Sequence, residues 1–231
     1  MIYITGDTHG EQNRLTYIFS NSGINWTAND YLIVCGDFGY MFTGKKHEEA
    51  FLNDLENIEA TILFVDGNHE NFDLLYSYPE ETWNGGKIHR IRKNVIHLMR
   101  GQVFTIQGKK IFTMGGGYSI DRYMRCEGVS WWPQEMPNDL EFKEAIANLK
   151  ANDFEVDYII THTAPENTMC MFHPHHEKEY ALNNFLEWVR ESTKYEHWYF
   201  GHLHTDKSLW LNQTALWFDI IPIETEDTSQ K

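Results

Sequence analysis

The stretch IYITGDTHG, at residues 2–10, joins a short β-branched run to a glycine, an aspartate and a histidine. A similar run leads into Gly36-Asp37, and a third, at residues 61–65, leads into Asp-Gly-Asn-His-Glu. Amphipathic segments with helical spacing, at residues 12–22 and 46–58, separate the three runs. This strand–helix order is typical of parallel βαβ units. The first third of the chain therefore predicts a parallel sheet whose strands end in polar side chains.

The rest of the chain predicts more strands and helices, combined in mixed sheets with helices outside. Residues 87–114 indicate an antiparallel meander that turns at Gln107-Gly108. We expect one domain over residues 1–223 and a polar tail over residues 224–231. The expected strands cover residues 2–5, 31–35, 61–65, 87–91, 95–98, 102–106, 110–114, 158–161, 198–200 and 215–219. The expected helices cover residues 12–22, 46–58, 71–76, 138–150 and 178–194.

The composition excludes several classes of protein. Apolar residues make up 42% and charged residues 23% of the 231 residues, which argues against disorder. The formal net charge of −15 argues against non-specific nucleic-acid binding over the whole surface, although it does not exclude a local basic patch. The chain thus predicts a folded α/β protein with an acidic surface.

The cysteines and the lengths of the apolar runs indicate the cellular compartment of the protein. Cys35, Cys126 and Cys170 lie far apart and form no CxxC pair, which favours a reducing compartment over a disulfide framework. The first residues do not form the pattern of a signal peptide. No apolar run approaches the roughly 20 residues that span a bilayer. We therefore expect a cytoplasmic protein without a membrane segment.

Metal-ligand side chains follow five of the expected strands. The carboxyl ends of neighbouring parallel strands meet at one edge of a sheet, so these side chains are expected to converge there. Carboxylate and amide oxygens mixed with imidazole suit Mn, Fe, Zn or Mg. A single His-x-His or Gly-Asp would be weak support, since each is common without a metal, but five pieces in order are not explained by chance. The candidate ligands are Asp7, His9, Asp37, Asn68, His162, His202 and His204.

These motifs match a known family. In chain order, Gly-Asp-x-His, Gly-Asp, Gly-Asn-His-Glu, Thr-His and Gly-His-x-His resemble the calcineurin-like metallophosphoesterases. The resemblance implies a four-layer α/β/β/α sandwich with two mixed sheets and a dinuclear metal site at the strand carboxyl ends. It implies two divalent cations as cofactors, with Mn expected and Fe, Zn or Mg as alternatives. The first cation would be held by Asp7, His9, Asp37 and His204, and the second by Asp37, Asn68, His162 and His202.

The resemblance also implies a reaction. A hydroxide bridging the two cations would attack the phosphorus of a phosphate ester, and His69 would stand near the leaving-group oxygen as a proton donor. The alternative for His69 is to orient a carboxylate such as Asp66 or Asp73. The chain lacks the Asp-Arg-Gly of the protein-phosphatase branch, because Phe38 and Gly39 follow Asp37. A phosphoprotein phosphatase is therefore not expected.

The substrate is expected to be a phosphodiester or a nucleotide-type small molecule. Alternatives within the same fold are a phosphomonoesterase and a nuclease, although extended nucleic acid is not favoured as the substrate. An alternative of a different class is a non-catalytic binding scaffold. The segment GGGYSIDRYMR, at residues 115–125, offers Tyr118, Arg122 and Arg125 as substrate-binding residues. The same rings and arginines could instead serve lid or interface packing, in a monomer or a homodimer.

Two further features remain open at this level. The basic stretch over residues 87–110 contains no acidic residue, and either it protects a sheet edge or it binds a phosphate-rich ligand. The histidines at positions 173, 175 and 176 either are solvated in a loop or contact the substrate.

Overall fold

The computed structural model describes residues 1–172 and 177–223. The first of its two sheets is parallel at its centre: β1, β2 and β3 pair in parallel, as predicted, and β6 continues the parallel order beside β3, which was not predicted. Its full strand order is β13-β1-β2-β3-β6-β5-β4. The strands are β1 (Ile2–Thr5), β2 (Tyr31–Val34), β3 (Thr61–Phe64), β4 (Glu80–Trp83), β5 (Gly86–Arg92), β6 (Val95–Leu98) and β13 (Ile221–Ile223).

The second sheet has the strand order β11-β12-β10-β9-β8-β7. Strands β8, β9, β10 and β12 are parallel, and both edge strands pair antiparallel. Both sheets are therefore mixed, which confirms the prediction. The strands are β7 (Gln102–Ile106), β8 (Lys109–Met114), β9 (Tyr158–Thr161), β10 (His197–Phe200), β11 (Lys207–Leu209) and β12 (Gln213–Ala215).

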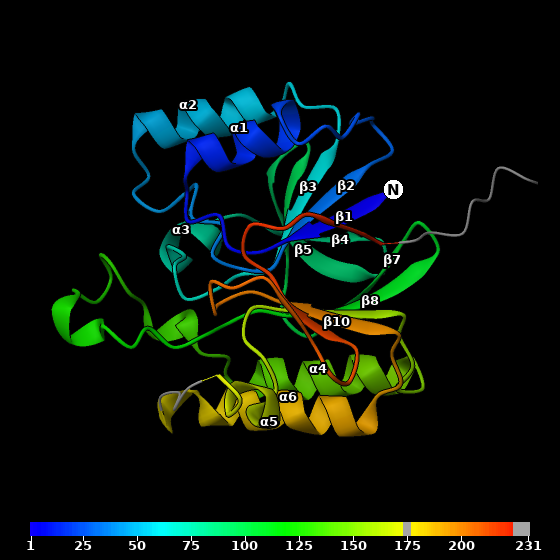
Figure 1. The fold of residues 1–231 in the computed structure, drawn as a ribbon. Helices are drawn as coiled ribbons and strands as arrows, with labels where there is room; N and C mark the ends of the chain where they lie inside the picture. Colours follow the sequence, from blue (N-terminus) through cyan, green and yellow to red (C-terminus); the bar gives the residue numbers. More distant parts are fainter. Residues whose placement is uncertain (173–176, 224–231) are drawn as a thin grey trace, which may run out of the picture.

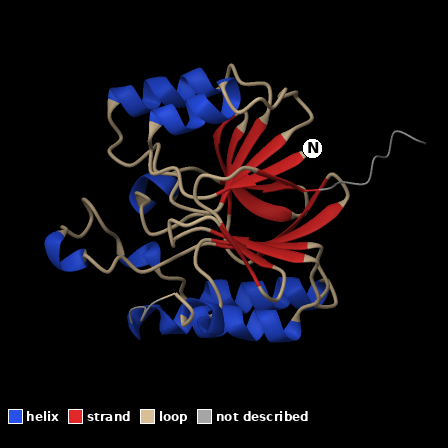
Figure 2. Ribbon diagram, viewed as in Figure 1, coloured by secondary structure: helices blue, strands red, loops and turns tan. Residues whose placement is uncertain are grey.

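The sheets face each other and the longer helices cover their outer faces (Figures 1 and 2). One apolar core fills the space between the sheets, and the other two lie between each sheet and its helices. Helices α1 (Gln12–Ser20) and α2 (Lys46–Leu55) cover the first sheet, and α4 (Asp139–Ala151) and α6 (Tyr180–Ser192) cover the second. The order of layers is thus helix, sheet, sheet, helix.

Short helices lie in the connecting loops. They are α3 (Phe72–Leu75), α5 (Glu166–Met169) and the 3-10 turns η1 (Arg122–Met124), η2 (Pro133–Glu135) and η3 (Glu177–Glu179). Within the described residues, no helix combines the length and the apolar character that a bilayer crossing requires. The single domain over residues 1–223 stays a prediction, and the expected tail lies outside the described residues.

The predicted meander is wrong in one respect, because it is divided between the sheets. Strands β5 and β6 pair in the first sheet, whereas β7 and β8 pair in the second. The chain crosses at Gly101, whose positive φ of 69° suits glycine and whose Cβ would lie 2.7 Å from Ala145 of α4. Alternation of apolar residues does not tell which sheet a strand joins. The turn at Gln107-Gly108 is confirmed, with φ of 49° and 80°.

The strand expected at residues 215–219 is also wrong beyond its first residue. Strand β12 ends at Ala215, and the backbone N–H groups of Trp217, Phe218 and Asp219 then donate to the Asp206 carboxylate. A side chain thus takes the hydrogen bonds that a strand would have given to its neighbour. Strands β4 and β11 were not predicted, because they are short and carry few apolar residues. Strand β13 was not predicted, because it has only three residues and a proline at its centre.

Candidate metal centre

The seven candidate ligands lie in the loops that follow β1, β2, β3, β9 and β10. These loops gather on one side of the two sheets, where Figure 2 shows them in tan. The first sheet supplies four of them and the second supplies three: Asp7, His9, Asp37 and Asn68 from the first, and His162, His202 and His204 from the second. The structure therefore brings the residues together at the edge where the sequence placed them.

One group of ligand atoms is built on Asp7, His9 and His204. His9 Nε2 lies 2.8 Å from His204 Nε2, and His204 Nε2 lies 3.1 Å from Asp7 Oδ2. Asp7 Oδ2 is buried and has no hydrogen-bond partner among the described residues. A buried carboxylate oxygen without a donor is costly, and a cation between these atoms would satisfy it.

A second group surrounds His162 Nε2. This atom lies 3.0 Å from Asn68 Oδ1, 3.2 Å from His202 Nδ1 and 3.4 Å from Asp37 Oδ1. Such spacings are expected between neighbouring ligands that each lie about 2.1 Å from one shared cation. Asn68 Nδ2 donates a hydrogen bond to Ser119 Oγ at 3.2 Å. This bond orients the amide so that Oδ1 faces the second group.

Asp37 lies between the two groups. Its Oδ2 is 3.7 Å from His9 Nδ1, while its Oδ1 faces His162 and also accepts the backbone N–H of His69 at 2.7 Å. Burial opposes ionisation, but His162, His69 and His9 outweigh it and lower the pKa of Asp37 to about 2. Asp37 is therefore an ionised carboxylate whose two oxygens face different groups.

The electrostatics of His162 favour a positive charge at the centre of the second group. Its Nδ1–H donates to the Cys35 carbonyl oxygen at 2.9 Å, which directs Nε2 toward the other ligands. Burial lowers the pKa of His162, but Asp37 and Asp7 outweigh it and raise the pKa above the usual value. A cation at Nε2 would supply the positive charge that these carboxylates favour.

The backbone is strained where it carries the ligands. His9, Asp37, His202 and His204 all have positive φ, between 46° and 63°, which costs roughly 1–3 kcal/mol for each non-glycine residue. Gly36 allows the close approach of the sheets, because a Cβ there would lie 2.1 Å from His162 Nδ1. Strain of this kind gathers at functional sites, where packing holds it in place.

His69 lies beside the first group without joining its closest contacts. Its ring centroid is 5.0 Å from that of His9, and Arg125 Nη2 lies 3.0 Å from its Nε2. Burial lowers the pKa of His69, and Asp37 partly opposes this effect. The carboxylates considered as its alternative partners are held elsewhere, Asp66 by Arg100 at 2.6 Å and Asp73 by Trp132 Nε1 at 2.8 Å.

The three residues expected to bind the substrate do not all lie at the same cavity. Tyr118 and Arg125 line the cavity over the metal ligands, but Arg122 does not. The Arg122 guanidinium lies over the rings of Tyr118 and Trp131, 4.1 and 4.3 Å from their centroids, and pairs with buried Glu135 at 2.8 Å. Arg122 thus holds its own loop together, whereas Arg125 reaches His69.

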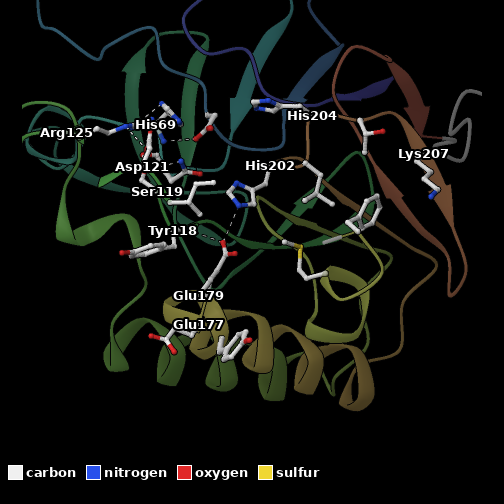
Figure 3. A pocket seen from close by; sticks show the side chains of 18 residues that line it. His69, Tyr118, Ser119, Asp121, Arg125, Glu177, Glu179, His202, His204 and Lys207 are labelled. Carbon is white, nitrogen blue, oxygen red and sulfur yellow. Dashed lines mark hydrogen bonds and ion pairs between the residues drawn. The ribbon is translucent and has the colours of Figure 1, made fainter. Parts of the chain in front are cut away.

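The cavity has a volume of about 1070 Å³. Its lining combines the candidate metal ligands Asp37, Asn68, His202 and His204 with a set of apolar side chains. Figure 3 shows Arg125 and Lys207 on opposite sides of His202. Lys207 Nζ lies 5.2 Å from the ring centroid of Phe172. The apolar side chains are Ile120, Met169, Phe172 and Leu203.

Sequence reasoning missed Glu179, which is 2% exposed and lies beside the second group. No pattern of neighbours marks this residue, because it comes from a short turn before α6. Glu70 belongs to the Gly-Asn-His-Glu motif, but the sequence predicted no role for it. Its carboxylate accepts the backbone N–H of Phe38 at 2.7 Å and so supports the loop that carries Asp37. The histidines at positions 173, 175 and 176 lie outside the described residues.

Two mixed sheets that gather carboxylate, amide and imidazole ligands at their strand ends have the fold and donor set of a metal-dependent hydrolase. A family model described as calcineurin-like phosphoesterase matches residues 1–206, and the chain belongs to this family. It is therefore a metal-dependent phosphoester hydrolase. The comparison with curated proteins gives no significant match.

Proposed function

We propose that the protein hydrolyses a phosphodiester or a nucleotide-type small substrate with two divalent cations, Mn²⁺ being the expected metal. The observation that carries this proposal is the pair of ligand groups described above, with one carboxylate, Asp37, facing both. Asp7, His9, Asp37 and His204 would hold one cation, and Asp37, Asn68, His162 and His202 the other. The mixture of oxygen and imidazole ligands, without a thiolate, supports Mn²⁺ over softer metals.

The cations, when bound, supply Lewis acidity that activates a water molecule at neutral pH and balances the charge of the phosphoryl oxygens. The chain's own residues provide the remaining parts. Arg125 donates to His69 in the structure. Arg125 Nε also pairs with Asp121 Oδ1 at 2.8 Å. A phosphate group would offer the two Nη atoms a charged acceptor in place of His69, and bidentate contact would orient it. His69 Nε2 would then be released to hold the proton that the leaving oxygen receives.

The cavity supports a small substrate over a polymer. Its apolar side chains and the Lys207–Phe172 pair suit a leaving group with a planar, partly apolar body such as a nucleoside. The basic stretch over residues 87–110 does not provide a phosphate track, because most of its cations are already paired with acids of this chain. These pairs are Lys87–Glu144, Arg90–Glu81, Arg92–Glu49, Arg100–Asp66 and Lys109–Asp157.

A substrate panel tests the proposal. Mn²⁺-loaded protein would be assayed with bis-para-nitrophenyl phosphate, para-nitrophenyl phosphate, cyclic nucleotides, dinucleoside polyphosphates and short oligonucleotides. We expect the diester and the nucleotide substrates to be cleaved faster than the monoester. A strong preference for the monoester would instead favour a phosphomonoesterase. Cleavage confined to oligonucleotides, with a steep loss of activity in salt, would favour a nuclease.

The scaffold alternative predicts a different result. A scaffold would bind the cations and hydrolyse none of these esters. The intact ligand set and the placement of His69 support an enzyme instead. We place the protein in the cytoplasm, a compartment that the free thiols of Cys35, Cys126 and Cys170 suit. Monomer and homodimer both remain compatible with this proposal, and gel filtration with light scattering would distinguish them.

A further inference from the structure

Glu179 is a buried carboxylate that the reaction described above does not use. It is 2% exposed, and it belongs to η3, in the turn that leads into α6. One of its oxygens, Oε1, accepts the backbone N–H of Tyr118 at 3.2 Å. The same oxygen lies 3.4 Å from His202 Nε2. Figure 3 shows this contact as a dashed line between the two side chains. Placing a carboxylate out of water is costly unless a partner favours its charge.

The two ring nitrogens of His202 face different partners. Nδ1 lies 3.2 Å from His162 Nε2, within the second ligand group, whereas Nε2 faces Glu179. A histidine that ligates a metal commonly donates its other N–H to a carboxylate, which fixes the tautomer and the ring orientation. The placement of Glu179 on the far side of the ring from the ligand group matches that arrangement.

The geometry points to Glu179 as a positioning residue that holds His202 with Nε2–H toward its carboxylate and Nδ1 toward the second cation. This inference rests on the proposed function, since it presupposes that the second group holds a cation. Glu179 lines the cavity, but in this arrangement it is not a ligand of the cation, and it acts on the metal site through the ring of His202. Through Tyr118 it also joins the loop after β8 to the metal centre.

The chain offers a matched control. Glu177 lies in the same turn and lines the same cavity, but it is exposed, and within the described residues no hydrogen bond or ion pair joins it to a candidate ligand. Replacing either glutamate by glutamine removes one negative charge near the centre. Glu177→Gln controls for the loss of a solvent-screened carboxylate in this turn. A loss of metal affinity caused by the buried charge alone would affect Glu179→Gln as strongly as Glu179→Ala. A loss caused by the missing support of His202 would affect only Glu179 variants.

The test measures Mn²⁺ binding to the full chain by calorimetry, with no substrate present. We expect wild type and Glu177→Gln to bind two cations. Glu179→Ala should keep one site at wild-type affinity and weaken the other by 10–100-fold. Glu179→Gln should weaken the same site less, because its amide oxygen still accepts from Nε2–H. Melting of the metal-free proteins checks folding, and if Glu179→Ala does not fold, the Glu179→Gln result decides.

A second measurement reports on the ring itself. In the Zn²⁺-loaded wild type, ¹⁵N NMR of the histidine side chains should show His202 protonated at Nε2 and metal-bound at Nδ1, and Glu179→Ala should lose this signature. Equal binding by all variants, or equal weakening of both sites, would overturn the role of Glu179. A wild-type chain that binds no cation would contradict the proposed function itself.

Discussion

Asp37 presents its two carboxylate oxygens to different ligand groups, Oδ2 toward His9 and Oδ1 toward His162. Asn68 contacts only the second group, through His162 Nε2. We expect Asp37→Ala to lose both cations and Asn68→Ala to lose one. Hydrolysis should fall by about 10³-fold or more in Asp37→Ala, since the metals contribute several kcal/mol to the transition state. Elemental analysis with kinetics checks this, and full metal content in Asp37→Ala would contradict it.

We propose that His69 acts on the leaving group and does not hold a metal, although one of its ring nitrogens lies within 4.8 Å of ligand atoms of His9 and Asp37. We expect His69→Ala to keep its cations and to lose 10²–10⁴-fold in kcat on esters with a poor leaving group. The loss should shrink for para-nitrophenolate, which leaves without a proton. A series of aryl diesters with leaving groups of increasing pKa measures this difference. Wild-type rates across the series in metal-loaded His69→Ala would show that another group supplies the proton.

At the scale of elements, the segment between β8 and α4 contains two arginines, one that stabilises the loop and one that faces the cavity. Arg122 pairs with buried Glu135, whereas Arg125 lines the cavity. We expect Arg122→Ala to lower the free energy of unfolding by about 1–3 kcal/mol, because a buried carboxylate loses its charged donor. Arg125→Ala should raise KM and lower the free energy of unfolding by about 1 kcal/mol or less, because its partner Asp121 is more exposed than Glu135. Urea unfolding and steady-state kinetics separate the two, and the reverse pattern would refute this division.

Strands β5 and β6 place His89 directly opposite His97, with their Nδ1 atoms 3.0 Å apart. Asp66 lies on the far side of His97, 3.0 Å from its Nε2. Burial, and then His97, lower the pKa of His89 to about 4, whereas an unfolded histidine has a pKa of about 6.5. As the pH falls between these values, the unfolded chain takes up the proton first. His89 therefore reduces stability progressively over that range.

The slope of stability against pH measures this effect. We expect the free energy of unfolding of the wild type to fall by about 1.4 kcal/mol more per pH unit, between about pH 6 and 4.5, than that of His89→Gln. Urea titrations at several pH values provide the measurement. His47, which is exposed on α2, gives the control variant His47→Gln. Parallel slopes in wild type and His89→Gln would exclude a buried neutral imidazole at this position.

At the scale of the whole molecule, the sequence predicted best what is local. The metal motifs follow directly on buried strands, so Asp7, Asp37 and Asn68 could be placed at a common edge from strand order alone. The division of residues 87–114 between two sheets could not be predicted, since apolar alternation fits either sheet. Side-chain contacts between separate segments could not be predicted either, because the sequence pattern does not show which loops meet. Glu135 and Glu179 become meaningful only after folding brings Arg122 and His202 to them.

The candidate ligands come from both sheets, so cations bound among them would connect the two halves of the fold. Four candidate ligands follow strands of the first sheet and three follow strands of the second. They are Asp7, His9, Asp37 and Asn68 in the first, and His162, His202 and His204 in the second. Binding to the folded chain alone stabilises it by about 2.7 kcal/mol for each site at a free metal concentration of 100 times Kd. For a chain of this size, one such site raises Tm by about 5–10 °C.

We therefore expect Mn²⁺ to raise the Tm of chelator-treated wild type by at least this amount, and to have little effect on Asp37→Ala. Differential scanning calorimetry, with NaCl at matched ionic strength as the control, measures the shift. Because the cations would connect the sheets, metal should also slow hydrogen exchange in β1 and β10 together rather than in one sheet alone. Protection confined to one sheet would mean that the ligands of the other do not reach the cations.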